Sequence, residues 1–141
     1  MQRNEIPKAY LYSQVVQAKL YIENNYDKEI NLELISREAA FSKFHFLRLF
    51  RKSFGLTPNQ FLTEVRLENA KKLFTQGVSV QDVCWQVGFD SLSSFSNLFK
   101  RKFGTSPTSY VQLNRNIKKE AIENPLKFIP DCFAENFNWK E

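Results

Sequence analysis

The sequence has little of what catalytic and metal sites are usually built from. Its 141 residues include one histidine, two cysteines and four glycines. His45 has no Cys, Asp or Glu at ligand spacing, and Cys84 and Cys132 form no CxxC pair. There is also no Gly-rich phosphate loop, no Ser/His/Asp set and no paired carboxylates. We therefore expect no enzyme, no metal and no cofactor. An enzyme on this scaffold, such as a repair methyltransferase, would require a reactive cysteine.

Long apolar runs and period-two alternation are missing as well. No segment approaches the roughly 20 apolar residues of a membrane span, and the first residues, MQRNEIPKAYLY, lack the apolar core of a secretory signal. We expect no membrane partner and a reducing, cytoplasmic setting. Because no segment alternates strongly between apolar and polar residues, the expected fold class is all-α.

Positive charge is concentrated in the middle of the chain. The net charge is +5. Residues 43–115 carry eleven Lys/Arg and four Asp/Glu, whereas residues 1–42 carry five and six, and residues 116–141 carry four and five. Such a basic region is the electrostatic footprint expected of a nucleic-acid binder, although many basic proteins bind no acidic partner.

One stretch occurs twice. Residues 46–61 read FLRLFRKSFGLTPNQF and residues 95–110 read FSNLFKRKFGTSPTSY, so that Phe50 recurs 49 residues later as Phe99. Each copy has an apolar stripe at helical spacing, a basic pair, a glycine stop and a Thr/Ser-Pro restart. A repeat of this length indicates one supersecondary unit used twice.

Caps and glycine stops predict about seven helices. They span roughly residues 13–24, 31–39, 42–54, 58–76, 80–87, 91–103 and 107–114. Short helix, tight turn and second helix form a helix-turn-helix, here in two copies joined by a long helix. The expected organisation is a lead-in at 1–12, a first subdomain at 13–56, a linker helix at 57–76, a second subdomain at 77–115 and an extended or docked tail at 116–141.

The outward faces of the two second helices offer groups that suit a major groove. Arg pairs with guanine, Asn with adenine, and an apolar side chain contacts the thymine methyl. Residues near the N-terminal end of a recognition helix usually reach base edges, and later cations meet phosphates. The predicted base contacts are Lys43, Phe44, Leu47, Arg48, Leu92, Ser93, Ser96 and Asn97. The predicted phosphate contacts are Arg51, Lys52, Thr57, Lys100, Arg101 and Ser106, the two hydroxyl residues lying at helix N-termini.

The linker helix has a length that suits duplex DNA. About 19 residues at ~1.5 Å each give roughly 28 Å, and one turn of B-DNA is about 34 Å. A rigid spacer of this order predicts two recognition helices in successive major grooves, so that one chain does what a dimer does in simpler repressors.

These motifs resemble the DNA-binding domain of the AraC/XylS family of bacterial transcription regulators over about residues 13–113. The second copy carries the most specific part, VGFDS at 87–91 followed by FS, LFK, FG and SPTSY up to Tyr110, and residues 42–52 are similar to the stand-alone members for multiple antibiotic and superoxide resistance. The resemblance implies seven helices, double-stranded DNA binding near a promoter, and recruitment of RNA polymerase. Asn97 stands where the family often has Arg, and the chain has no room for a separate sensing domain.

The alternative is a helical interaction module whose aromatic tail binds a protein or a small ligand.

The two copies of the repeat differ on their outward faces, and the turn is one residue longer in the second, counting from Phe41 to Phe50 and from Phe89 to Phe99. We therefore expect an activator that reads two unlike half-sites, as a monomer on an asymmetric site.

Overall fold

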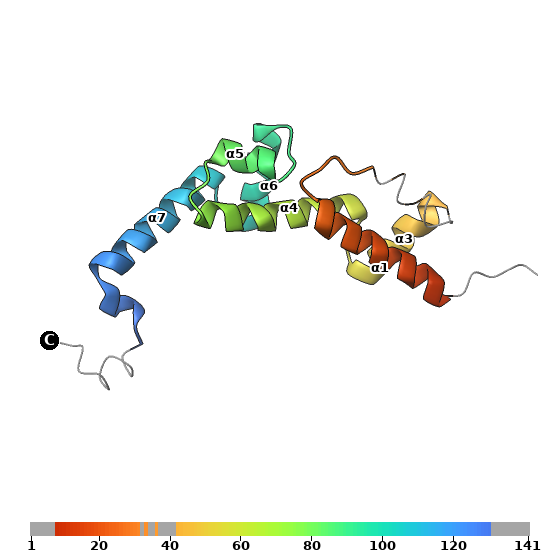
Figure 1. The fold of residues 1–141 in the computed structure, drawn as a ribbon, viewed down its shortest axis with the longest axis horizontal. Helices are drawn as coiled ribbons and strands as arrows, with labels where there is room; N and C mark the ends of the chain where they lie inside the picture. Colours follow the sequence, from red (N-terminus) through yellow and green to blue (C-terminus); the bar gives the residue numbers. More distant parts are fainter. Residues whose placement is uncertain (1–7, 32, 34–35, 37–41, 131–141) are drawn as a thin grey trace, which may run out of the picture. The chain divides into compact units, whose positions relative to one another are not determined.

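The computed structural model describes residues 8–31, 33, 36 and 42–130, and this part of the chain is all-helical (Figure 1). It contains six α-helices and one 3-10 helix, and no strand occurs among the described residues. This confirms the predicted fold class. The chain divides into two compact units, residues 1–92 and 93–141. The division falls near the start of the second helix of the second predicted helix-turn-helix, and the predicted domain bounds stay a prediction.

The first unit contains α1 (Lys8–Asn25), α3 (Lys43–Phe54), α4 (Pro58–Thr75) and α5 (Val80–Gln86). Helices α1, α3 and α4 pack against one another, and α5 packs against α4 (Figure 1). Of the predicted helix at 31–39, only Asn31, Glu33 and Ser36 are described, and Glu33 and Ser36 are helical. The core of α1, α3 and α4 consists of Val15, Ala18, Ile22, Phe46, Leu49, Phe50 and Leu62.

Local signals fix the ends of α3. The Ser42 side chain accepts a hydrogen bond from the His45 backbone N–H and caps the helix. At the other end Gly55 adopts φ +75°, where a residue without Cβ is favoured, and its N–H donates to the Arg51 carbonyl. Between these ends Phe46, Leu49 and Phe50 are buried, as the repeat predicted, while Phe54 is half-buried.

The second unit contains α6 (Leu92–Phe103), apart from its first residue, together with α7 (Pro107–Glu123) and the 3-10 helix η1 (Pro125–Phe128). Phe95 and Phe99 are fully buried, as predicted, and Leu98 and Phe103 are half-buried. The η1 helix packs back on α7 (Figure 1).

The sequence repeat recurs as a repeated aromatic cluster. Phe50 packs edge-on against Phe54 and Phe61, with ring centroids 4.8 and 5.9 Å apart. Forty-nine residues later, Phe99 packs edge-on against Phe103 and Tyr110 at 4.6 and 5.5 Å. Phe46 and Phe95 complete the clusters, 6.0 and 5.8 Å from Phe50 and Phe99 respectively. In each copy, aromatic side chains therefore fix one helix, α3 or α6, against the helix that follows it, α4 or α7.

The N-terminal helix differs from its prediction. It begins at Lys8, so that Ser13 lies inside it and does not cap it. It buries Val15, Ala18 and Ile22, whereas the apolar residues Val16 and Leu20 are 46% and 48% exposed. The helix has apolar residues on more than one side, so the spacing did not single out the buried face.

The linker helix buries more than one stripe along its length. Phe61, Val65 and Leu73 are only half-buried, although they are apolar. The buried residues are Pro58, Leu62, Leu67, Ala70 and Phe74. Only Leu62 among them belongs to the core with α1 and α3. Because α4 packs against α1 and α3 and also against α5, its buried residues do not follow a single helical stripe.

The prediction of an extended tail from residue 116 is wrong for its first part. Helix α7 continues to Glu123 instead of ending near Asn114, and η1 follows. Residues 131–141, with the remaining tail aromatics, lie outside the described residues. No described helix is both long enough and apolar enough to cross a membrane.

Candidate nucleic-acid interface

The N-terminal turns of α3 present an apolar and basic surface. Phe44 is 80% exposed, although α3 buries Phe46 and Phe50. Arg48, one turn after Phe44, is also exposed. Leu47 is half-buried and packs against the core of the first unit. Phe44 therefore presents an exposed aromatic ring on the same helix turns as two exposed cations, Lys43 and Arg48.

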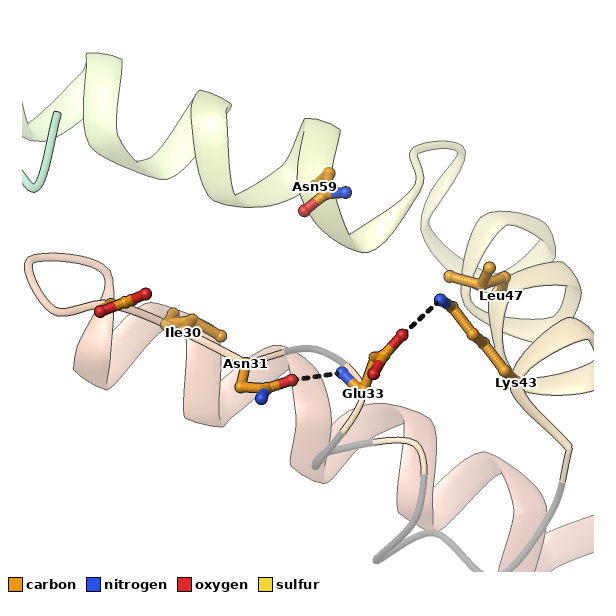
Figure 2. A pocket seen from close by; sticks show the side chains of 7 residues that line it. Ile30, Asn31, Glu33, Lys43, Leu47 and Asn59 are labelled. Atoms are coloured by element: carbon orange, nitrogen blue, oxygen red, sulfur yellow. Dashed lines mark hydrogen bonds and ion pairs between the residues drawn. The ribbon is translucent and has the colours of Figure 1, made fainter. Parts of the chain in front are cut away.

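Lys43, the first residue of α3, forms an ion pair with Glu33. Its Nζ lies 3.1 Å from Glu33 Oε1, and both side chains are more than half exposed (Figure 2). The Glu33 backbone N–H in turn donates to Asn31 Oδ1 at 3.0 Å. Lys43 and Glu33 line an open pocket of about 510 Å³ together with Leu47 and Asn59, among others (Figure 2). Glu33 therefore holds the ammonium group of Lys43 beside the exposed residues Phe44 and Arg48. The carboxylate of Glu33 would repel an approaching phosphate.

The last turn of α3 carries the cations predicted to contact phosphate. Arg51 and Lys52 are both exposed. Within the part of the chain that the structure describes, neither they nor Arg48 form an ion pair. Cations near a helix C-terminus also offset the negative end of the helix dipole. Their guanidinium and ammonium groups are accessible to a phosphate backbone.

Helix α6 presents a different surface at the equivalent positions. Leu92 is 40% exposed, Ser93 and Asn97 are exposed, and Ser96 is half-buried. Lys100 and Arg101 in the last turn are exposed. At these positions α6 is thus uncharged, with one leucine and three polar residues, where α3 is aromatic and cationic, while both helices carry a basic pair in the last turn.

The two helices that follow begin with the same cap. Thr57 Oγ1 accepts from the Gln60 N–H, and Gln60 Oε1 accepts from the Thr57 N–H, a complete capping box on α4. Ser106 Oγ accepts from the Ser109 N–H on α7. Pro58 and Pro107 occupy the first helical positions. Each N-terminus presents backbone N–H groups that can bind an anion.

Sequence reasoning missed two residues that bear on this surface. Glu33 lies in the helix predicted at residues 31–39 and was not singled out, yet it pairs with Lys43 ten residues away. Arg66 of α4 was not singled out, yet it hydrogen-bonds to backbone carbonyls 38 and 40 residues earlier in the chain. No local pattern marks such pairings.

Groups for other chemistry are sparse. No set of three His, Cys, Asp or Glu side chains suited to a metal occurs among the described residues. Cys84 is fully buried. Burial, and secondarily the nearby charge of Asp90, raises the pKa of its thiol. Cys84 is thus held in the neutral, unreactive form.

Comparison with known proteins places this geometry among DNA-binding domains. Residues 35–113 match the family model of a helix-turn-helix domain. The HTH-type transcriptional activator AarP of Providencia stuartii is 34% identical over 92 residues, which are 64% of this chain and 68% of AarP. Across eight curated relatives, the matched region covers from 26% to 68% of the relative's length.

Two solved structures share the fold. A probable AraC family transcriptional regulator from Rhodopseudomonas palustris has a TM-score of 0.66 and 28% identity, over 72% of this chain and 97% of that one. The DNA-binding domain of AdpA, a global transcriptional factor, was solved with a target DNA and has a TM-score of 0.60 and 27% identity, over 82% and 96% of the two chains.

Proposed function

Because the chain belongs to the AraC-type helix-turn-helix family of transcriptional regulators, we propose that it binds double-stranded DNA sequence-specifically and regulates transcription. The recognition elements are α3 and α6. The observation that carries the proposal is the repeated aromatic scaffold with two unlike exposed faces. Phe50 and Phe99 are the centres of equivalent clusters. The exposed residues differ, with Phe44 and Arg48 on α3 but Ser93 and Asn97 on α6.

Base and phosphate contacts divide along each recognition helix. Lys43, Phe44, Leu47 and Arg48 read one half-site, and Leu92, Ser93, Ser96 and Asn97 read the other. Cations and helix N-termini hold the backbone in register without reading sequence. These phosphate-binding groups are Arg51, Lys52, Thr57, Lys100, Arg101 and Ser106.

Helix α4 supports binding to successive major grooves. Its 18 residues span about 27 Å at ~1.5 Å each, which is of the order of one helical turn of B-DNA, about 34 Å. Since the two faces differ, we propose that one chain binds an asymmetric site as a monomer. AarP is named a transcriptional activator, and on that basis we propose activation, with RNA polymerase as the protein partner and the bacterial cytoplasm as the setting.

The test is selection of bound sequences from random duplex DNA, followed by gel-shift titration at several salt concentrations. A specific regulator enriches a bipartite, non-palindromic site. Its log affinity falls with log salt by about 0.9 for each phosphate neutralised. Enrichment of no sequence, or an affinity independent of salt, would contradict the proposal. A palindromic site would contradict the monomer.

A further inference from the structure

Arg66, in the middle of α4, is hydrogen-bonded to the turn that follows α1. Its Nε donates to the Tyr26 carbonyl at 2.7 Å, and its Nη2 donates to the Lys28 carbonyl at 3.0 Å. The turn itself is closed by a hydrogen bond from the Lys28 N–H to the Asn25 carbonyl. A planar guanidinium can donate to two carbonyls at once. The ammonium group of lysine is a compact point charge and cannot reproduce this geometry.

The same guanidinium contacts the turn that ends α5. Its central carbon lies 5.6 Å from the centroid of the Phe89 ring. Gly88 has φ +97°, and a Cβ at this position would lie 2.8 Å from the Tyr26 carbonyl oxygen and 3.0 Å from Arg66 Nε. The backbone of residue 88 therefore packs directly on the hydrogen bond between Arg66 and Tyr26. Only glycine fits there.

Carboxylates complete the surroundings. Burial lowers the pKa of Arg66, while the charges of Asp90 and Asp27 raise it. Arg66, Gly88 and Asp90 line a pocket of about 380 Å³ with residues that include Leu62. One side chain thus joins three segments, the turn after α1, the middle of α4 and the turn before α6.

We infer that Arg66 is a positioning residue: it holds residues 88–90, which lead into the second recognition helix, on α4 and on the turn after α1, and this contact determines which half-site spacing the protein accepts. Only Ser91 separates Asp90 from the first residue of α6. Holding residues 88–90 against Arg66 of α4 and the turn after α1 therefore restrains Leu92, the first residue of α6 and one of the proposed base contacts. This inference rests on the proposed function.

The restraint should raise the affinity for DNA that carries both half-sites. It should not change the affinity for either half-site by itself. Two linked binding elements gain affinity from their effective concentration, which is highest when their separation matches that of the sites. Loosening the link lowers the gain at the matched spacing and broadens the range of spacings that are tolerated.

The experiment uses the full chain and the bipartite site obtained by selection. Probes carry each half-site alone, or both with the spacing changed by about one or two base pairs either way. The variants are Arg66→Lys, which keeps the charge, and Arg66→Met, which keeps much of the length. Lys72→Met is the matched control, because it removes one exposed positive charge from the same helix. Circular dichroism and thermal unfolding establish that each variant folds.

For both Arg66 variants we expect single half-site affinities within about twofold of the wild type, and a loss of about tenfold at the selected spacing. The preference for that spacing should flatten, while Lys72→Met keeps the wild-type profile. The inference is overturned by an unchanged spacing profile, by equal losses on single and paired half-sites, or by a wild type without spacing preference. It is also overturned if neither variant folds, since Arg66 is then simply part of the fold. Failure of the wild type to bind any selected DNA would instead refute the proposed function.

Discussion

Lys43 Nζ lies 3.1 Å from Glu33 Oε1, at the first residue of the helix that carries the aromatic and basic surface. A cation at a helix N-terminus is disfavoured by the helix dipole, and the carboxylate offsets part of this cost. Because both groups are more than half exposed, the pair itself contributes little to stability. Its effect falls on the proposed DNA binding, since the base contact proposed for Lys43 must compete with Glu33.

Glu33→Gln should therefore strengthen DNA binding. An exposed ion pair is worth up to about 1 kcal/mol, so the expected gain is up to about fivefold in affinity, with a steeper salt dependence. Gel-shift titration at several salt concentrations measures both. Glu29→Gln is the matched control. It removes another carboxylate from the same pocket, and this carboxylate forms no ion pair within the described residues. Weaker binding by Glu33→Gln would mean that Glu33 orients Lys43 for DNA.

Two arginines one turn apart on α3 test the division between base and phosphate contacts. Arg48→Ala should relax the preference at one base position and cost about 1–3 kcal/mol on the selected site. Arg51→Ala should weaken all sequences alike and reduce the salt slope by about 0.9. Selection repeated with each variant, with salt titrations, compares them. If the two variants behave alike, the division is wrong.

Phe44 and Phe50 lie on different faces of α3, one exposed and one buried, and should separate binding from stability. Phe50 is fully buried and Phe44 is 80% exposed. Phe50→Ala should cost about 3–5 kcal/mol of unfolding free energy, because it removes a ring from a packed cluster. Phe44→Ala should change stability by less than about 0.5 kcal/mol and weaken DNA binding by about tenfold through lost apolar contact. Urea denaturation and gel shifts measure the two effects. A destabilised Phe44→Ala would place Phe44 in the core.

Cys84 should resist alkylation in the native state. A Cys132→Ser background leaves it as the only thiol. Burial raises the pKa of Cys84, so the reactive thiolate is rarer than in the unfolded chain at any given pH. Iodoacetamide labelling followed by mass spectrometry should be slow in buffer and fast in urea. Rapid labelling of the folded protein would contradict this.

The raised pKa of Cys84 also determines the direction in which the unfolding free energy changes with pH. The native state binds the Cys84 proton more tightly than the unfolded state, because the pKa is raised on folding. Its contribution is complete below the unfolded pKa and is lost as the pH rises through the folded pKa. Urea denaturation across alkaline pH, compared with Cys84→Ala, should show a steeper decline for the cysteine form. An equal decline in the two proteins would contradict the assignment.

The repeat was readable from the sequence because its signals are local. The inward side chains Phe46, Phe50, Phe95 and Phe99 follow helical spacing, and the glycine stops and Thr/Ser-Pro starts mark helix ends that the structure has at Gly55, Thr57, Gly104 and Ser106. Helices α1 and α4 were harder to predict. Each has apolar residues on more than one side, so which of them become buried depends on where the neighbouring helices pack.

The sequence by itself determined the all-α class, the ends of most helices and the duplicated aromatic core, because caps and amphipathic stripes act within a few residues of one another. Tertiary structure alone decided that Glu33 pairs with Lys43 and that Arg66 joins Tyr26, Lys28 and Phe89. These partners are ten to forty residues apart. Such contacts leave no periodicity in the chain, since they form only after the helices have packed.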